Sequence, residues 1–336
     1  MILVTGGTGL VGSHLLFNLT RSENKIRATY RKNSNIKAVE KVFSYYVSSS
    51  EAKNQFSKIE WFEADIQDIP ALSRAFRGVK FVYHCAALVS FDPKDAKNLR
   101  NINIAGTANI VNLCIANSII KLCHVSSTAS LGKPLEGKTI TEETAWNPEE
   151  NYSDYAISKY GAEIEVWRGT QEGVHAVIVN PGIIIGPGYW DSGSGLLFSK
   201  VSKGFNFYFP KITAFVDVKD VVRAMQELMI SDRKNEQYLL VAENLSFREV
   251  LCLTAGSLDK NPPSIELKRW MVFTGWIFQT FGSLFGFKKQ ITRDAVKTLF
   301  DEWHFSNKKI KNDLDFTFTP IADSVLKTGK IFKNEN

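Results

Sequence analysis

The sequence predicts an α/β fold in which a doubly wound parallel sheet is followed by a smaller, mostly helical C-terminal lobe. Two observations carry this prediction. Short apolar runs alternate with helical patterns over the first half of the chain, and a glycine-rich segment directly follows the first of these runs. The 336 residues, of which 44% are hydrophobic, suffice for one large domain and a lobe of this kind.

The predicted strands and helices follow the order βαβαβ, twice over. After the first strand, five apolar runs are separated by segments with helical periodicity that begin at Asn, Ser or Pro. Because parallel strands need a crossover connection, this alternation indicates a parallel sheet of the Rossmann type. We expect strands at residues 25–30, 60–65, 81–85, 120–126 and 175–180, and the clearest helices at 93–117, 152–172 and 217–230.

The N-terminal segment predicts a dinucleotide-binding turn. The apolar run from Met1 to Thr5 leads into Gly6, Gly9 and Gly12, and an amphipathic run follows. Glycines at this spacing let the backbone turn tightly, approach a pyrophosphate and pack the next helix against the strand, while the helix N-terminus offers free N–H groups. A purely structural turn would also contain glycines, but the flanking strand and helix supply the context that the motif requires.

The alternation of strands and helices ends near residue 182, and we place a domain boundary there. Residues 1–182 are expected to form the dinucleotide-binding domain, to which a strand, helix and strand within 213–241 return. The substrate-binding lobe is expected to comprise residues 183–212 and 242–336, with helices at 246–258, 291–303 and 320–332 and a further helix that opens at 306–309.

Within the lobe, residues 270–287 are eighteen residues without a charged side chain, flanked by basic residues on both sides. The length just reaches that of a membrane-spanning helix, but three glycines interrupt the stretch and the basic flanks give no orientation signal. We therefore expect a buried lobe helix or a helical hairpin. Peripheral contact with a membrane through an interfacial helix is the alternative.

Charge and cysteine content exclude several classes of function. The net charge of +6 is spread along the sequence without a basic block, so we expect no nucleic-acid partner. The four cysteines lack metal-ligand spacing, and we expect reduced thiols and no metal site. Because the first strand begins at Met1 and leaves no room for a signal peptide, a cytoplasmic protein is expected.

The end of the second predicted strand indicates which dinucleotide is preferred. In a dinucleotide fold an acidic residue there selects the free ribose 2′-hydroxyl, whereas an arginine accommodates a 2′-phosphate. This chain has Arg31 and Lys32 and no acid at that position, so NADP(H) is preferred and NAD(H) is the alternative. Both residues could instead be solvated side chains on a turn. Asp65, at the end of the third strand, could accept from the adenine amino group or cap the next helix, although Asp68 is the better cap.

Side chains in two segments have the properties needed for proton transfer. Tyr155 and Lys159 lie four residues apart on a predicted helix, so they share one face, and a nearby ammonium favours the phenolate form of a tyrosine. Hydroxyls at Ser126, Ser127 and Thr128 end the fifth strand, at the edge of the sheet where doubly wound folds bind ligands. A solvated Tyr-Lys pair and serines that cap turns are the alternative interpretations.

Together these motifs resemble the extended short-chain dehydrogenase/reductase family over most of the chain. Beyond the glycine loop, the strand-end serine and the Tyr-x-x-x-Lys pair, four further segments match the family in order. They are His84-Cys85-Ala86-Ala87, Asn103-Ile104-Ala105-Gly106-Thr107, Asn180-Pro181-Gly182 with Gly186-Pro187-Gly188, and Phe215-Val216-Asp217-Val218-Lys219-Asp220-Val221. Within the family the chain looks closest to dihydroflavonol reductase-like and 3β-hydroxysteroid dehydrogenase-like members.

The resemblance implies a role for each matching residue. Tyr155 would be the general acid/base, Lys159 would bind the nicotinamide ribose and lower the pKa of the tyrosine, and Ser127 would hold the substrate oxygen. Asn180 departs from the family, where arginine is frequent, and Asn103 is left outside the catalytic set as a packing residue. The implied cofactor-binding residues are Gly6, Thr8, Gly9, Leu10, Val11, Gly12, Arg31, Lys32, Asp65, Ile66, Ala86, Ala87, Tyr155, Lys159, Pro181, Gly182 and Ile183.

Three functions fit these residues. The first is an NADP(H)-dependent reductase or dehydrogenase that transfers a hydride between nicotinamide and a carbonyl or alcohol of a lipophilic small molecule. The second is a nucleotide-sugar epimerase or dehydratase with tightly bound NAD, for which Lys200, Lys203, Lys211 and Arg223 are candidate diphosphate ligands. The third is a binding protein without turnover, which the intact Ser127, Tyr155 and Lys159 disfavour. The family resemblance also implies a homodimer formed through the helices at 93–117 and 152–172.

Overall fold

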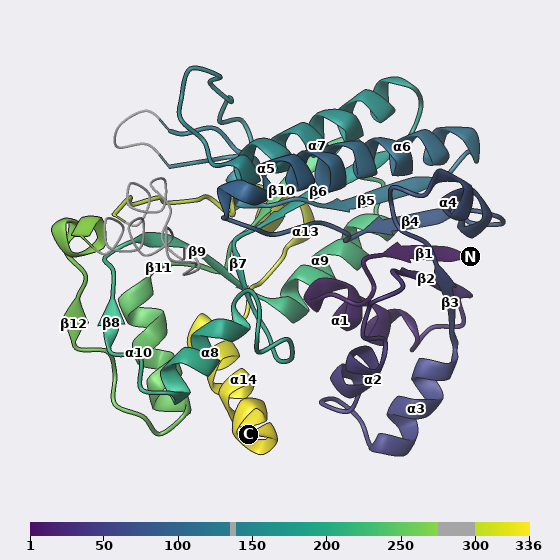
Figure 1. Cartoon of the computed structure of the whole chain (residues 1–336). Helices are drawn as coiled ribbons and strands as arrows, with labels where there is room; N and C mark the ends of the chain where they lie inside the picture. The colour runs from purple at the N-terminus through teal and green to yellow at the C-terminus, as the bar shows by residue number, and fades with distance from the viewer. Residues whose placement is uncertain (135–138, 275–299) are drawn as a thin grey trace.

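A seven-stranded parallel sheet forms the centre of the computed structural model, which describes residues 1–134, 139–274 and 300–336 (Figure 1). Its strand order is β10-β6-β5-β4-β1-β2-β3, so the order reverses between β1 and β4, as in doubly wound folds. This confirms the predicted fold class. The strands are β1 (Ile2–Thr5), β2 (Ile26–Tyr30), β3 (Ile59–Glu63), β4 (Phe81–His84), β5 (Lys121–Val125), β6 (Ala176–Pro181) and β10 (Glu236–Leu240).

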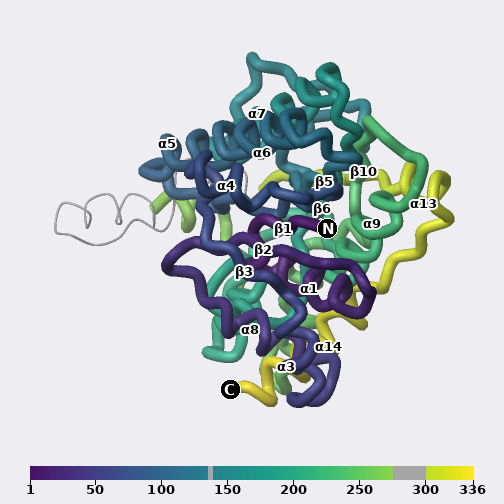
Figure 2. Tube along the Cα trace, turned by 90° about the vertical axis from the view of Figure 1, so that its right-hand side faces the viewer, coloured from purple at the N-terminus to yellow at the C-terminus, as the bar shows by residue number. Residues whose placement is uncertain are grey.

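Helices cover both faces of this sheet. Figures 1 and 2 agree that α6 and α7 lie together on one side and that α1 and α9 lie on the other. Successive residues of β1 face opposite sides: Leu3 packs with the helices α4, α6 and α7, whereas Val4 packs with α1 and α9. The helices of the two layers are α1 (Leu10–Leu19), α2 (Lys37–Phe43), α3 (Ser49–Ser57), α4 (Ile69–Ala75), α5 (Ala96–Leu99), α6 (Gly106–Ala116), α7 (Asp154–Gln171) and α9 (Val218–Ile230).

A smaller lobe packs beside the carboxyl edge of the sheet. Its core joins Phe198, Phe215, Leu251, Ile321 and Phe332, so segments from before and after α9 share one apolar cluster. Within residues 213–241, β10 pairs with β6 in the main sheet, whereas β9 pairs with β7 and β11 in a small sheet. The lobe elements are β7 (Ile183–Ile185), α8 (Gly195–Ser202), β8 (Phe207–Tyr208), β9 (Ile212–Asp217), β11 (Glu243–Ser246), α10 (Phe247–Ser257), β12 (Ile265–Glu266) and α14 (Ile321–Glu335). In contrast, α13 (Lys308–Leu314) packs against β10, and its Ile310 joins the core of the main domain.

The helix expected at 93–117 is interrupted, which corrects that prediction. A 3₁₀ turn at Pro93–Asp95 and the short α5 lead into a π-helical stretch, Arg100–Ala105, before α6 begins. The Thr107 hydroxyl donates to the carbonyl oxygen of Asn103 at 2.6 Å, and side-chain bonds of this kind compete with the regular helical ladder. Apolar periodicity does not reveal side-chain hydrogen bonds of this kind, which accompany the interruption.

Two of the predictions for the lobe fall partly or wholly outside the described residues. The helix expected at 291–303 and most of the apolar stretch at 270–287 lie within or overlap residues 275–299. Among the helices that the structure does describe, none has the length and apolar character needed to cross a bilayer.

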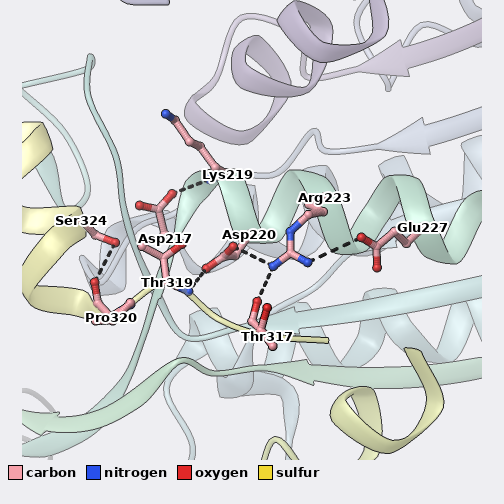
Figure 3. A network of polar contacts seen from close by, with 9 residues as sticks. All are labelled: Asp217, Lys219, Asp220, Arg223, Glu227, Thr317, Thr319, Pro320 and Ser324. Carbon is pink, nitrogen blue, oxygen red and sulfur yellow. Dashed lines mark hydrogen bonds and ion pairs between the residues drawn. The ribbon is translucent and has the colours of Figure 1, made fainter. Parts of the chain in front are cut away.

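A polar network ties the C-terminal segment to α9 (Figure 3). Asp217 caps this helix by accepting from the amide of Lys219 at 2.6 Å. The buried carboxylate of Asp220 accepts from the Arg223 guanidinium at 3.0 Å and from the Thr319 amide at 2.6 Å. Arg223 in turn donates to the carbonyl of Thr317 and pairs with Glu227. The acidic residues of the Phe-Val-Asp-Val-x-Asp-Val stretch are therefore structural in this chain.

Removing the Asp220 carboxylate should loosen this connection. Replacing Asp220 by alanine leaves the Thr319 amide unpaired and Arg223 without its buried partner, so we expect the free energy of unfolding to fall by about 2 to 4 kcal/mol. Urea unfolding followed by circular dichroism measures this change. Asp232→Ala, which alters an aspartate just beyond the same helix, is the control, and equal stabilities of the two variants would contradict the structural role.

Candidate active site

The predicted site residues come together because their strands are parallel. The loops that follow β1, β2, β3, β4, β5 and β6 all leave the same edge of the sheet, which is where doubly wound folds bind ligands. The glycine loop, Arg31, Asp65, Ala86, Ser127 and Pro181 therefore lie along one edge, as the sequence predicted.

The glycine loop has the shape of a cradle for a pyrophosphate. Gly6 has a φ of +71°, and a Cβ there would lie 2.5 Å from the Ala86 amide nitrogen. A Cβ on Gly12 would lie 2.2 Å from the carbonyl oxygen of Gly6, so these two positions require glycine for the fold itself. At Gly9 the nearest atom is 3.5 Å away, which leaves ordinary space.

The N-terminus of α1 is open to an anion. Gly9 is the N-cap and supplies no side chain, so the first-turn amides of Leu10, Val11 and Gly12 have no capping partner within the helix. Thr8 is half-buried in the turn before them. Unpaired amides and the positive end of the helix dipole suit a diphosphate, so the residues present fit a dinucleotide.

A cavity of about 510 Å³ lies where the adenosine half of a dinucleotide would bind. It is lined by Arg31, Lys32, Asn33, Glu63, Ala64, Asp65 and Asp68. Asp68 caps α4 by accepting from the Ala71 amide at 3.0 Å, as expected, while Asp65 accepts from the Gln67 amide at 2.9 Å. Asp65 is therefore engaged in its own turn, with its second carboxylate oxygen left for a ligand.

Sequence reasoning did not find Glu63 in this cavity. The residue ends β3 and pairs in register with Tyr30 at the end of β2, so it lies beside the Arg31 turn. The basic side of the cavity thus comes from the loop after β2 and the acidic side from β3 and its loop. Strand pairing, which brings β3 next to β2 in this fold, is the signal that could have found Glu63.

Tyr155 and Lys159 project from α7 toward the end of β5, where Ser127 lies. Ser127 accepts from the Ala129 amide at 3.1 Å and thereby caps the short 3₁₀ turn Thr128–Ser130. This cap uses the oxygen of the hydroxyl and leaves its proton free to donate. Capping of a turn, the alternative interpretation of these hydroxyls, therefore applies to Ser127, the residue also expected to touch substrate.

Burial governs the titration of the two α7 side chains. It raises the pKa of Tyr155, and the facing Ser127 side chain lowers it in part. Lys159 is only 2% exposed and donates to the Val125 carbonyl oxygen at 2.8 Å. Burial lowers the pKa of Lys159 to about 8. The hydrogen bond from Ser127 thus acts on Tyr155 in the direction that the sequence led us to expect of Lys159, whose own effect on the tyrosine stays a prediction.

Asn103 connects the loop after β4 to α7. Its amide group donates to the Leu88 carbonyl and accepts from the Leu88 amide, at 2.9 and 2.7 Å, and it also donates to the Ser158 hydroxyl at 2.9 Å. Because Ser158 immediately precedes Lys159, these bonds fix the spacing between the loop and the Tyr155 helix. The packing role predicted for Asn103 is consistent with this geometry.

The same loop carries an exposed aromatic ring that sequence reasoning missed. Phe91 is 66% exposed, and its ring meets that of Tyr155 edge-on with the centroids 5.4 Å apart. Val89, 59% exposed, lies on the same loop. An exposed apolar ring in contact with Tyr155 favours apolar ligands at this position.

The remaining predicted cofactor residues follow β3, β4 and β6. Ile66 packs against Gly106, and Asn109 donates to its carbonyl oxygen at 3.0 Å. Gly182 follows Pro181 at the end of β6, and Ile183 begins β7. Ala87 lies in the loop after β4, directly before Leu88, whose backbone bonds to Asn103.

Neither metal nor disulfide chemistry is indicated within the described part of the chain. No group of three or more His, Cys, Asp or Glu side chains there could hold a metal ion. Cys85, Cys114, Cys123 and Cys252 are free thiols, and burial raises the pKa of Cys85 to about 12.

A nucleotide cradle and a Ser-Tyr-Lys group at one edge of a Rossmann sheet define a class of NAD(P)-dependent oxidoreductase-type enzymes. The comparisons agree. Residues 2–240 match the profile described as "NAD dependent epimerase/dehydratase family", so the chain belongs to this family and is an extended short-chain dehydrogenase/reductase.

Relatives of the chain include both reductases and epimerases. It is 26% identical to a putative dihydroflavonol 4-reductase of Synechocystis over 98% of this chain and 94% of that protein. It is 28% identical to a UDP-glucose 4-epimerase of Vibrio cholerae over 89% of this chain and 86% of that protein. The crystal structure of the Thermus thermophilus UDP-glucose 4-epimerase complex with NAD superposes with a TM-score of 0.74 at 20% identity, covering 100% and 99% of the two chains, and it shares the fold.

Proposed function

We propose that this enzyme is an NADP(H)-dependent reductase that acts on a carbonyl group of a lipophilic small molecule. The observation that carries this proposal is the pairing of two features at one sheet edge. The Arg31 and Lys32 side of the adenosine cavity suits a 2′-phosphate, and the exposed Phe91 ring lies against Tyr155. The reductase relative supports the same reaction class.

Ser127, Tyr155 and Lys159 each have a separate role in the proposed carbonyl reduction. Bound nicotinamide supplies the hydride. Ser127, whose proton the turn does not use, donates to the substrate oxygen and orients it, and Tyr155 delivers a proton to that oxygen as negative charge develops. Lys159 lies one helical turn from Tyr155. In this proposal it holds the nicotinamide ribose, and its positive charge favours loss of the tyrosine proton.

The 2′-phosphate assignment makes a specific prediction. Replacing Arg31 by alanine should raise the dissociation constant for NADPH by about tenfold or more, because a charge-assisted phosphate contact is lost, and leave that for NADH within about twofold. Fluorescence titration of both cofactors measures the change.

Arg21→Ala is the matched control, since this exposed arginine follows α1 at the opposite edge of the sheet. An equal loss of affinity for both cofactors in the Arg31→Ala variant would contradict the assignment. So would tighter binding of NADH than of NADPH by the unaltered protein, because Glu63 would then be the residue that selects the ribose.

A nucleotide-sugar epimerase or dehydratase with tightly bound NAD is the second candidate. The epimerase relative favours it. Against it, Arg223 is engaged with Asp220, Glu227 and Thr317, and so is not free to bind a substrate diphosphate. Lys200, Lys203 and Lys211 remain as candidate ligands. Denaturing the purified protein separates the two proposals, because an epimerase of this kind releases retained NAD.

A further inference from the structure

Glu163 is a buried carboxyl group that the proposed reaction leaves without a role. It lies on α7 one turn after Lys159 and is 3% exposed. Its Oε1 atom lies 2.5 Å from the Ser130 hydroxyl and 2.6 Å from the Asn180 side-chain nitrogen. We call residues 126–130 the serine turn, because they present Ser127 to Tyr155. Ser130 belongs to this turn, and Asn180 contacts it from β6.

The protons available to the serine turn can be counted. The Ser130 hydroxyl oxygen lies 2.6 Å from the Ser127 carbonyl oxygen and 2.5 Å from the carboxyl of Glu163. A carbonyl oxygen only accepts, and a hydroxyl has one proton to give. If Ser130 donates to Ser127, the short contact with Glu163 needs a second proton, and a protonated Glu163 is the group that can supply it.

Asn180 is compatible with a neutral carboxyl at this position. Its side-chain nitrogen lies within bonding distance of Glu163, of the Ser130 hydroxyl at 3.0 Å and of the Ser127 carbonyl at 3.3 Å. Asparagine is uncharged, whereas the arginine expected from the family pattern would pair with a carboxylate. The Asn180 oxygen is buried without a hydrogen-bond partner. The polar groups that bind Glu163 from the turn and from β6 are therefore all neutral.

We propose that Glu163 is a positioning residue that carries a proton and donates it to Ser130, thereby fixing the turn that presents Ser127 to the substrate oxygen. This inference rests on the proposed role of Ser127. Burial also raises the pKa of Glu163, although hydrogen bonds from Ser126, Ser130 and Asn180 and the charge of Lys159 oppose that shift.

The charged and titratable groups around Glu163 are few. Lys159 faces it from the same helix. Lys159 in turn interacts with His84 on β4, with Cys85 just after that strand and with His124 on β5. Burial keeps the two histidines and the thiol neutral, since it lowers the pKa of His84 to about 3 and raises that of Cys85. A cavity of about 200 Å³ behind α7, lined by Trp146, Tyr160, Trp167 and Gln237, reaches Glu163 and Ser130. The proton can therefore exchange with solvent away from the Tyr155 side of the helix.

Loss of this proton at higher pH should disturb the turn. A carboxylate would take the Ser130 proton, and the Ser127 carbonyl would lose one of its donors. Glu163→Leu removes the donor at all pH values and should lower kcat by about tenfold to a hundredfold through misplacement of Ser127. Glu163→Gln restores a donor that does not titrate, so it should recover most of that loss and weaken the decline of kcat at alkaline pH.

Infrared difference spectra test protonation without any substrate. The spectrum of the unaltered enzyme minus that of Glu163→Gln at pH 7 should contain the carbonyl band of a protonated carboxylic acid. Glu172→Gln changes an exposed glutamate at the C-terminal end of α7, and its difference spectrum should contain only carboxylate bands. A carboxylate band from Glu163 would overturn the proposal, as would failure of Glu163→Gln to recover activity lost in Glu163→Leu. If no carbonyl substrate is reduced, the proposed function fails, while the infrared result still decides the state of Glu163.

Discussion

Replacing Tyr155 by phenylalanine is expected to lower kcat for carbonyl reduction by about a hundredfold to ten-thousandfold, the range typical of lost general acid/base catalysis. The phenol is the group that contacts Ser127 and that stands one turn from Lys159. Phenylalanine keeps the ring, and with it the edge-on contact to Phe91, so the fold and the cofactor cradle should be unaffected.

Two measurements separate chemistry from binding in this variant. The rate of NADPH oxidation should fall, whereas the dissociation constant for NADPH should stay within about threefold, because the lost hydroxyl acts in the transition state. Tyr160→Phe is the control, since Tyr160 stacks on Trp146 on another side of α7. Full activity of Tyr155→Phe would show that the Ser-Tyr-Lys group is not the catalytic centre and would favour a binding role without turnover.

Replacing Gly9 by valine should weaken binding of both NADPH and NADH by about a hundredfold or more, because the side chain occupies the space that the pyrophosphate must approach. Gly9 has extended backbone angles, with φ −98° and ψ 176°, which any residue can adopt. A Cβ there meets its nearest neighbour at 3.5 Å. The variant should therefore remain folded and still fail to bind a cofactor.

Gly12 provides the contrast for this experiment. Its Cβ would lie 2.2 Å from a backbone carbonyl oxygen, so Gly12→Ala should lose stability as well as cofactor affinity. Thermal unfolding and cofactor titration of the two variants, measured together, distinguish the two positions. A Gly9→Val protein that binds NADPH normally would mean that the pyrophosphate does not approach this loop.

The elements with strong periodicity were predictable from the sequence. The five later strands were placed within two residues of their observed ends, and the β10 return to the main sheet was anticipated, because apolar runs and helical spacing are local properties. The interruption of the 93–117 helix was not predictable, since apolar spacing continues through it and the hydrogen bond between Thr107 and Asn103 leaves no periodic signal.

The residues of the site that belong to local sequence motifs could be predicted, and the others could not. Ser127, Tyr155 and Lys159 are recognisable from spacing, but the surroundings that tune them come from distant segments. Glu63 enters the adenosine cavity through strand pairing, and Glu163 meets Asn180 from 17 residues away across two elements. Phe91 is a single exposed ring in a loop. Such contacts depend on tertiary packing, and a lone sequence has no periodic signal for them.

Transfer of deuterium from cofactor to product tests the central claim most directly. The enzyme is incubated with NADPH that carries deuterium at the reactive C4 position and with a panel of apolar aldehydes and ketones, and the products are analysed by mass spectrometry. We predict an alcohol that contains one deuterium and stoichiometric release of NADP⁺. Unlabelled products, or a nucleotide-sugar reaction that proceeds with retained NAD and no net oxidation of cofactor, would contradict the account.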